Sequence, residues 1–170
     1  AEVLRSAGYE TGLIGKWHLG AGPYSPDRQG FDFVFGGAAS GNPGRYFYPY
    51  AFTDAGAPGE YLTDRVTIEA RGFIERNRDG PFCLVVAHWA VHTPIQAKEE
   101  YVAHFRDKAR RLGIVDRDPV YAAMIKSLDD SVGGILDALE REGIADRTVV
   151  IFASDNGGMV LRGYEMAQNT

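Results

Sequence analysis

The chain has 170 residues, of which 45% are hydrophobic and 12% aromatic, and its formal net charge is −5. This length and composition suit one folded domain with its own core and exclude a disordered chain. The lysines and arginines are scattered along the sequence, which argues against a nucleic-acid partner, and no apolar run approaches the roughly 20 residues of a membrane span.

The first third of the chain predicts short elements broken by glycine-rich loops. Residues 2–7 read as the last turns of a helix that Gly8 stops, and residues 9–14 read as a short strand. Residues 31–35 form a second short strand. The glycine- and aromatic-rich residues 36–59 form a long loop, which we expect to pack against the domain.

The rest of the chain predicts longer elements. Apolar residues at helical spacing indicate helices over residues 63–77 and 98–111. Between them, residues 82–88 form an almost wholly apolar strand, which is typical of a central strand covered on both faces. Asp118, an N-cap followed by proline, begins the longest helix, and Gly143 ends it.

The longest helix is predicted to bury one apolar stripe. Its members are Tyr121, Ile125, Leu128, Val132, Ile135, Leu136 and Leu139. Residues 148–153 follow as a second fully apolar strand. Because helices and strands alternate, the fold class is α/β, with a mostly parallel central sheet flanked by helices.

Two cationic side chains follow the first predicted strand. Residues 8–20 place four glycines around a short apolar stretch and end by presenting Lys16 and His18. In extended backbone, side chains two residues apart point to the same side, so the ammonium and the imidazole are expected to lie together. Trp17 then points the other way and packs. Two cationic donors held together suit an anion.

Asp155 and Asn156 come directly after the last predicted strand. In open α/β sheets, ligands bind beyond the carboxyl ends of the strands. Carboxylate and amide oxygens are hard donors that suit Ca²⁺ or Mg²⁺, and the glycines that follow allow the chain to turn so that both reach one ion. The alternative is a turn in which the two side chains bond to their own backbone.

His92 lies beyond the end of the strand at residues 82–88, at the same edge of the predicted sheet. A Thr-Pro pair follows it and keeps the backbone extended there. His88 closes an apolar strand and is predicted to be a core histidine. His104 is predicted to be a solvated residue on the helix over residues 98–111.

Four motifs in order carry a family resemblance: Gly-Lys-Trp-His-Leu-Gly at 15–20, Gly-Phe-Asp-Phe-Val-Phe-Gly at 30–36, His-Thr-Pro at 92–94 and Ser-Asp-Asn-Gly-Gly at 154–158. Together they resemble the sulfatase family of the alkaline-phosphatase-like superfamily, from Leu4 to about Gly158. The resemblance implies an alkaline-phosphatase-like sheet that is incomplete at both ends, with residues 1–170 forming part of a catalytic domain.

The resemblance also implies the activity and the site. The full-length protein would hydrolyse sulfate monoesters of a sugar or an aryl alcohol. Lys16, His18 and His92 match the family residues that contact the sulfate and the nucleophile. Asp155 and Asn156 match a pair that binds Ca²⁺, with Mg²⁺ as the second choice.

Some family features are missing from the printed residues. Sulfatases use a formylglycine made within Cys/Ser-x-Pro-x-Arg, and no such motif occurs here. An acidic pair of further calcium ligands and a second sulfate-binding lysine are also missing, and Leu161-Arg162-Gly163 does not replace that lysine. We therefore expect these groups to lie outside the chain, which alone would be inactive. The family further implies a formylglycine-generating enzyme as partner, and a periplasmic, secreted or lysosomal location.

Two other functions stay open at this stage. One is a phosphomonoester or phosphonate hydrolase of the same superfamily, and the other is a non-catalytic relative that binds sulfated glycans. The Gly-Lys-Trp-His-Leu-Gly run favours a sulfate ester. An enzyme is favoured because the candidate site residues are all retained, namely Lys16, His18, His92 and the Asp-Asn pair at 155–156.

Overall fold

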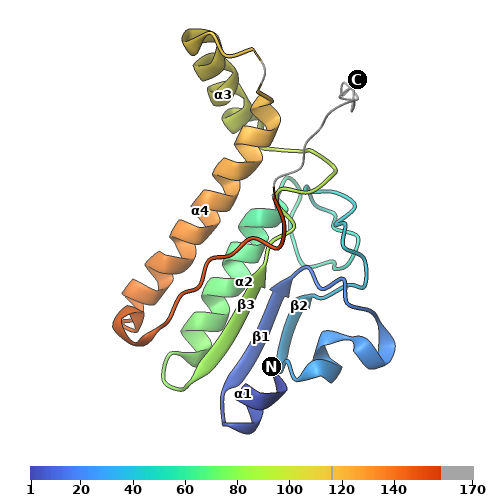
Figure 1. Ribbon diagram of the computed structural model, residues 1–170, viewed down its shortest axis with the longest axis vertical. Coiled ribbons are helices and arrows are strands. Elements are labelled where there is room, and N and C mark those ends of the chain that lie inside the picture. Colours follow the sequence, from blue (N-terminus) through green and yellow to red (C-terminus); the bar gives the residue numbers. More distant parts are fainter. Residues whose placement is uncertain (116, 158–170) are drawn as a thin grey trace.

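The structure, a computed structural model, describes residues 1–115 and 117–157 (Figure 1). The predicted helices, and the strands predicted in the first 90 residues, are confirmed with ends that differ by at most two residues. The elements are α1 (Glu2–Ser6), β1 (Glu10–Gly15), β2 (Phe33–Gly36), α2 (Leu62–Asn77), β3 (Phe82–Ala87), α3 (Glu99–Leu112) and α4 (Pro119–Arg141), with the 3-10 turns η1 (Gly22–Tyr24), η2 (Pro26–Gln29) and η3 (Ala145–Arg147).

The three strands form a parallel sheet in the order β2-β1-β3, which confirms the α/β class. Gly15 pairs with Gly36 on one side and with Ala87 on the other, so all three strands end at the same edge. Residues 11–15 of β1 are buried. The apolar composition of β3 predicts that β3 is the central strand. This prediction is wrong for the described sheet, in which β1 lies at the centre. Val85 of β3 is 41% exposed, because this strand lies at the edge.

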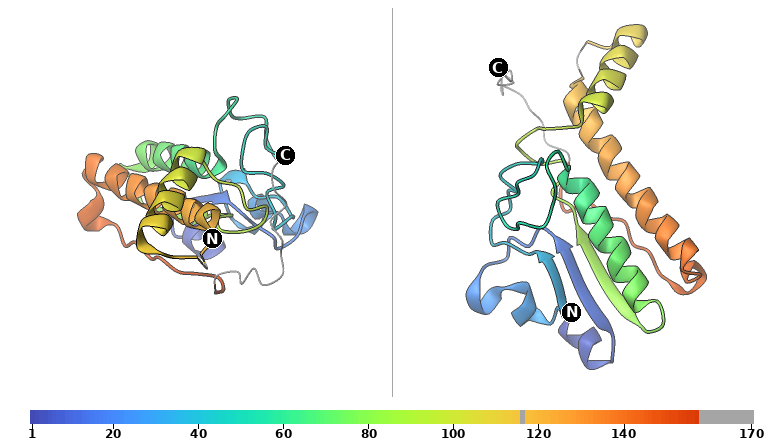
Figure 2. Two further views of the ribbon diagram at one scale, coloured as in Figure 1. Left: turned by 90° about the horizontal axis from the view of Figure 1, so that it is seen from above. Right: turned by 180° about the vertical axis from the view of Figure 1, so that it is seen from behind.

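Helix α2 packs against β1 and β3, and α4 packs on α2 (Figures 1 and 2). Phe73 of α2 is 1% exposed. The centroid of its ring lies 5.7 Å from that of Phe33 in β2 and 5.9 Å from that of Phe82 in β3. One aromatic side chain thus joins the helix to both outer strands. In the described part, no helix is both long enough and apolar enough to cross a membrane.

The buried face of α4 differs from the predicted stripe. Its buried residues are Ala123, Met124, Ser127, Ser131, Ala138 and Leu139. Two residues of the predicted stripe, Ile125 and Leu136, are 47% and 42% exposed. Small side chains allow α4 to approach its neighbours closely, so packing against α2 and α3 selects this face rather than the most apolar one.

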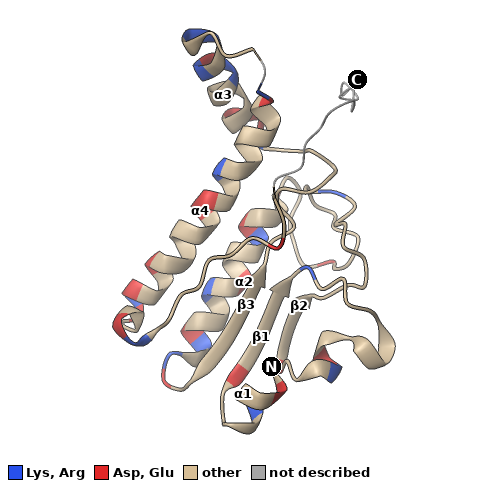
Figure 3. Cartoon of the chain, viewed as in Figure 1, with Lys and Arg blue, Asp and Glu red and all other residues tan. Residues whose placement is uncertain are grey.

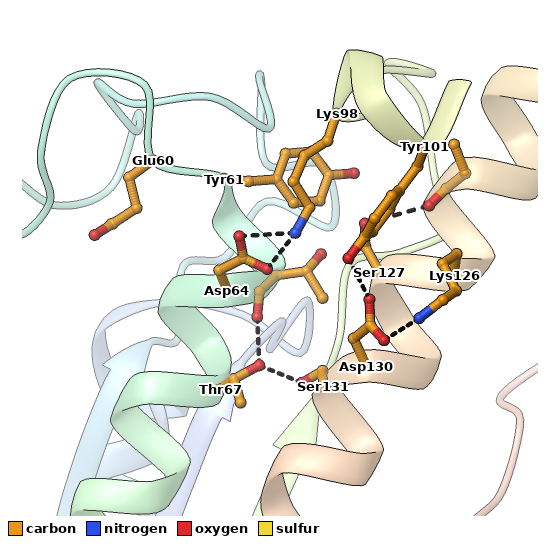
Figure 4. A network of polar contacts seen from close by, with 12 residues as sticks. Glu60, Tyr61, Asp64, Thr67, Lys98, Tyr101, Lys126, Ser127, Asp130 and Ser131 are labelled. Atoms are coloured by element: carbon orange, nitrogen blue, oxygen red, sulfur yellow. Dashed lines mark hydrogen bonds and ion pairs between the residues drawn. The ribbon is translucent and has the colours of Figure 1, made fainter. Parts of the chain in front are cut away.

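Polar contacts hold α3 to its neighbours (Figure 4). The Lys98 ammonium lies 2.9 and 3.0 Å from the carboxylate oxygens of Asp64 in α2. The Tyr101 hydroxyl donates to Asp130 of α4 at 2.7 Å, and Lys126 pairs with the same carboxylate. Charged residues are common along α3 and α4 (Figure 3). Their polar contacts supplement the little apolar burial on α3, where Val102 is the buried residue.

Residues 148–153 do not form the predicted strand. Their apolar side chains are 54% to 87% exposed, as shown by Val149, Val150, Ile151 and Phe152. A strand needs a neighbour to satisfy its backbone N–H and C=O groups, and apolar composition cannot supply one. Within the described residues no strand pairs with this segment. The prediction of a strand here is therefore wrong.

Candidate functional site

Lys16 emerges from the carboxyl edge of the sheet. β1 ends at Gly15, whose φ of 116° turns the chain out of the strand. The Lys16 N–H still donates to the Ala87 carbonyl of β3 at 2.7 Å. The backbone of Lys16 is thereby held against β3, while its side chain lies beyond the strand ends, where α/β sheets bind ligands.

The structure brings Lys16 and Asp155 together across 139 positions of sequence. The Lys16 ammonium lies 3.3 Å from a carboxylate oxygen of Asp155, and the two side chains are 25% and 71% exposed. Asp155 is predicted at this edge because it follows the apolar residues 148–153, which form no strand in the described part of the chain. The residue reaches the edge nevertheless, because the extended backbone before it leads there (Figure 1).

Asn156 makes local contacts. Its backbone N–H donates to the Asp155 carboxylate at 2.9 Å, and its side-chain amide donates to the Gly157 carbonyl at 3.0 Å. These are the contacts of the self-bonded turn considered as an alternative above. The Gly158 that closes the motif lies outside the described residues.

The oxygen donors of Asp155 and Asn156 are of the type that binds a hard cation, but two residues provide too few of them for a complete site. Ca²⁺ takes six to eight oxygen ligands, and these two residues supply few of them. Across residues 1–115 and 117–157, no group of three or more His, Cys, Asp or Glu side chains is placed to hold a metal. The predicted ligands can therefore form only part of a metal site.

The backbone at His18 is not extended, contrary to what the prediction assumed. The expectation that it shares a face with Lys16 assumed extended backbone, but β1 has already ended and His18 has a φ of 58°. Its N–H donates to the Ala38 carbonyl at 3.3 Å, and its side chain is exposed. Trp17 packs as predicted, since its indole N–H donates to the Tyr24 carbonyl at 2.8 Å and its ring meets that of Phe31 edge-on.

His92 lies in the loop after β3 with its ring orientation set locally. Its Nδ1 lies 2.9 Å from the Thr93 carbonyl oxygen and 3.3 Å from the Thr93 hydroxyl, and because the carbonyl can only accept, we assign the proton of the neutral ring to Nδ1. The neutral ring therefore presents Nε2 as its second, unprotonated nitrogen. The His92 backbone N–H donates to the Tyr46 hydroxyl at 3.3 Å.

His88 was expected in the core and lies half-buried directly after β3, and His104 is exposed, as predicted. The His88 Nε2 lies 3.3 Å from the Ser131 hydroxyl, which in turn lies 2.6 Å from that of Thr67 (Figure 4). Burial lowers the pKa of His88 from 6.5 to about 4, because the charged ring cannot be solvated there.

We therefore predict that stability falls as the pH is lowered from about 6.5 to about 4, by up to about 3 kcal/mol. In this window the unfolded chain binds a proton at His88 and the folded chain does not, so acid favours unfolding. Urea denaturation at a series of pH values measures the slope. A His88→Gln variant should lose most of it, and a slope that persists in this variant would assign the effect to other groups.

With this geometry in hand, comparisons with known proteins define the family. A family model described as Sulfatase matches residues 1–170. Arylsulfatase J of Mus musculus is 31% identical over 95% of this chain and 29% of its own length. N-acetylgalactosamine-6-sulfatase of Homo sapiens is 33% identical over 96% of this chain and 33% of its own length. A crystal structure of Ps i-CgsB in complex with k-i-k-neocarrahexaose has a TM-score of 0.64 and 30% identity, over 84% of this chain and 36% of that one.

The chain thus belongs to the sulfatase family, whose named members here are sulfuric ester hydrolases. It spans about a third of the length of these relatives. Three residues not predicted from the sequence contact His18 and His92 or support those contacts: Gly41, Tyr46 and Gln96. No motif signals them, because their contacts depend on how the loop between β2 and α2 folds.

Proposed function

We propose that the full-length protein hydrolyses sulfate monoesters and that this chain supplies Lys16, His18 and His92 to the bound sulfate. The observation that carries the proposal is the ion pair between Lys16 and Asp155 at the carboxyl edge of the sheet. It joins the first and last motifs of a chain that the sulfatase model matches throughout.

Lys16 suits a sulfate oxygen as its partner. An ammonium has three N–H donors, and Asp155 uses one of them at 3.3 Å, which leaves two for an anion. The side chain is only 25% exposed, so water screens its charge less than that of a surface lysine. A fixed cation of this kind stabilises the negative charge on the sulfonyl oxygens in the transition state.

His92 suits the leaving group. With Nδ1 hydrogen-bonded to the Thr93 carbonyl, Nε2 is the ring nitrogen left for another partner. When the ring is protonated, Nε2 can donate a proton to the alcohol oxygen as the S–O bond breaks. His18, with an exposed ring, provides a second donor at the same edge of the sheet.

We further propose that Asp155 and Asn156 provide part of a Ca²⁺ site, and that a formylglycine outside these 170 residues is the nucleophile. A bound Ca²⁺ would act as a Lewis acid that withdraws charge from the sulfate oxygens. The names of the relatives support a sulfated glycan as the substrate class, since one is an N-acetylgalactosamine-6-sulfatase and one solved structure contains a neocarrahexaose.

The test uses the full-length protein co-expressed with a formylglycine-generating enzyme and supplied with calcium. Initial rates are compared on an aryl sulfate and on the matching aryl phosphate. We expect faster turnover of the sulfate, and we expect Lys16→Ala and His92→Ala to lower kcat by about 100-fold or more, the usual effect of removing one such group.

Two exposed residues of α3 provide matched controls, Lys108→Ala and His104→Ala, which should keep the wild-type rate. Faster turnover of the phosphate would favour the phosphatase alternative. Binding of sulfated glycan without turnover of either ester would favour a non-catalytic relative. Full activity of Lys16→Ala and His92→Ala would remove these residues from the site.

A further inference from the structure

The loop between β2 and α2, residues 37–61, has a defined packing arrangement despite its length, and we call it the aromatic loop. Tyr46 and Tyr61 are 0% and 1% exposed, and their rings stack with centroids 5.7 Å apart. The Tyr46 carbonyl accepts the N–H of Leu62, the first residue of α2, at 2.7 Å. The middle of the loop is thereby attached to the start of a core helix.

Gln96 ties the aromatic loop to the segment that carries His92. Its side-chain oxygen accepts the Tyr46 N–H at 2.9 Å, and its backbone carbonyl accepts the Tyr61 hydroxyl at 2.8 Å. Both tyrosines are thus bonded to one residue, four positions after His92. Because the two tyrosines are buried and Gln96 is half-buried, leaving these groups unpaired would cost free energy, which favours a single arrangement.

The aromatic loop also contacts His92 directly. The Tyr46 hydroxyl accepts the His92 N–H at 3.3 Å. Burial raises the pKa of Tyr46 above its ordinary value, because the charged phenolate cannot be solvated there. The position of the His92 backbone is therefore set by a fully buried side chain from another loop.

A second contact holds His18. The Ala38 carbonyl accepts the His18 N–H at 3.3 Å. A Cβ at Gly41 would lie 2.3 Å from Nδ1 of the His18 ring and 2.7 Å from two of its carbons. The ring therefore lies close against the backbone of Gly41, and a Cβ at this position would force the exposed ring to move.

We propose that the aromatic loop positions both site histidines, with Gly41 setting the place of the His18 ring and Tyr46 that of the His92 backbone. The proposal rests on the sulfatase function proposed above. Gly41 and Tyr46 would act through the histidines that they contact, so the role proposed for them is that of positioning residues. Two imidazoles that follow different strands would then keep a fixed relation, as a reaction requiring both of them needs.

The test compares Gly41→Ala and Tyr46→Phe in the full-length, formylglycine-bearing protein. We expect kcat on an aryl sulfate to fall by about 100-fold in Gly41→Ala and about 10-fold in Tyr46→Phe, with KM within about threefold, because misplaced groups slow the reaction more than they weaken binding. The pH profile of kcat/KM should also move, since the His18 ring changes its surroundings.

Two controls separate positioning from general damage. Tyr50→Phe removes another buried hydroxyl of the aromatic loop, one that donates to Glu60 at 2.9 Å. Gly80→Ala adds a Cβ that meets nothing within 4 Å. Both should keep kcat and the pH profile. Equal losses in Tyr50→Phe and Tyr46→Phe would reduce the effect to loop stability and overturn the proposal.

An activity-independent measurement keeps this proposal separate from the proposed function. Imidazole and amide NMR signals of the histidines, assigned with His18→Gln and His92→Gln, should shift at His18 in Gly41→Ala and at His92 in Tyr46→Phe. If the wild type hydrolyses no sulfate ester, the sulfatase proposal fails but the NMR test still applies. Unchanged His18 signals in Gly41→Ala and unchanged His92 signals in Tyr46→Phe would overturn the positioning proposal. With an active wild type, full activity of both variants would overturn it.

Discussion

Replacing Gly15 with alanine is expected to destabilise the chain by about 2–5 kcal/mol. Gly15 closes β1 with a φ of 116°, and a Cβ there would lie 2.0 Å from the Ala87 carbonyl oxygen. The same carbonyl accepts the Lys16 N–H at 2.7 Å. The clash cannot be relieved without separating β1 from β3 where Lys16 leaves the sheet. Urea denaturation followed by circular dichroism measures the loss.

Gly8→Ala is the matched control for this substitution. Gly8 also has a positive φ, of 86°, but a Cβ there meets nothing within 4 Å. This variant should therefore lose only the cost of the left-handed backbone, about 1–2 kcal/mol. An equal loss of stability in the two variants would contradict this prediction, because the close approach of β1 and β3 would then add nothing to the cost of the left-handed backbone.

Truncating Phe73 to alanine is expected to cost about 3–5 kcal/mol. The ring is 1% exposed and lies between Phe33 and Phe82. It also packs closely on Gly12 of β1, where an added Cβ would lie 2.7 Å from the ring. Its loss would leave a cavity between α2 and all three strands. The change in the urea midpoint, at an unchanged slope, measures the effect.

Ile68→Ala on the same helix is the control, because Ile68 is 49% exposed. Its truncation should change the free energy of unfolding by about 0.5 kcal/mol. If Phe73→Ala were as mild as Ile68→Ala, the core would have to refill the cavity by moving α2 toward the sheet.

The helices agree closely with their prediction, because caps and side-chain spacing act locally. The N-cap of α4 is an example, since Asp118 accepts the Val120 N–H at 2.8 Å, two residues away. Capping and helical spacing act within a few residues, so they can be read from the chain alone. The buried face of α4 could not be read in this way, because it depends on which helices pack against it.

The segment at residues 148–153 shows the limit most clearly. Its composition is that of a buried strand, yet Ile151 is 85% exposed and no strand of the described part pairs with it. Whether a segment is buried and paired depends on its neighbours as well as on its own residues. The same reason explains why β3, the more apolar strand, lies at the edge of the described sheet while β1 lies at its centre.

The sequence by itself determined the α/β class, the limits of most elements and the family, because periodicity, caps and motifs are properties of the chain. It also named Lys16, His18, His92, Asp155 and Asn156 as candidates. Only the tertiary structure decided that Lys16 pairs with Asp155 and that the aromatic loop contacts His18 and His92. These contacts join residues far apart in the chain, and only packing brings such residues together.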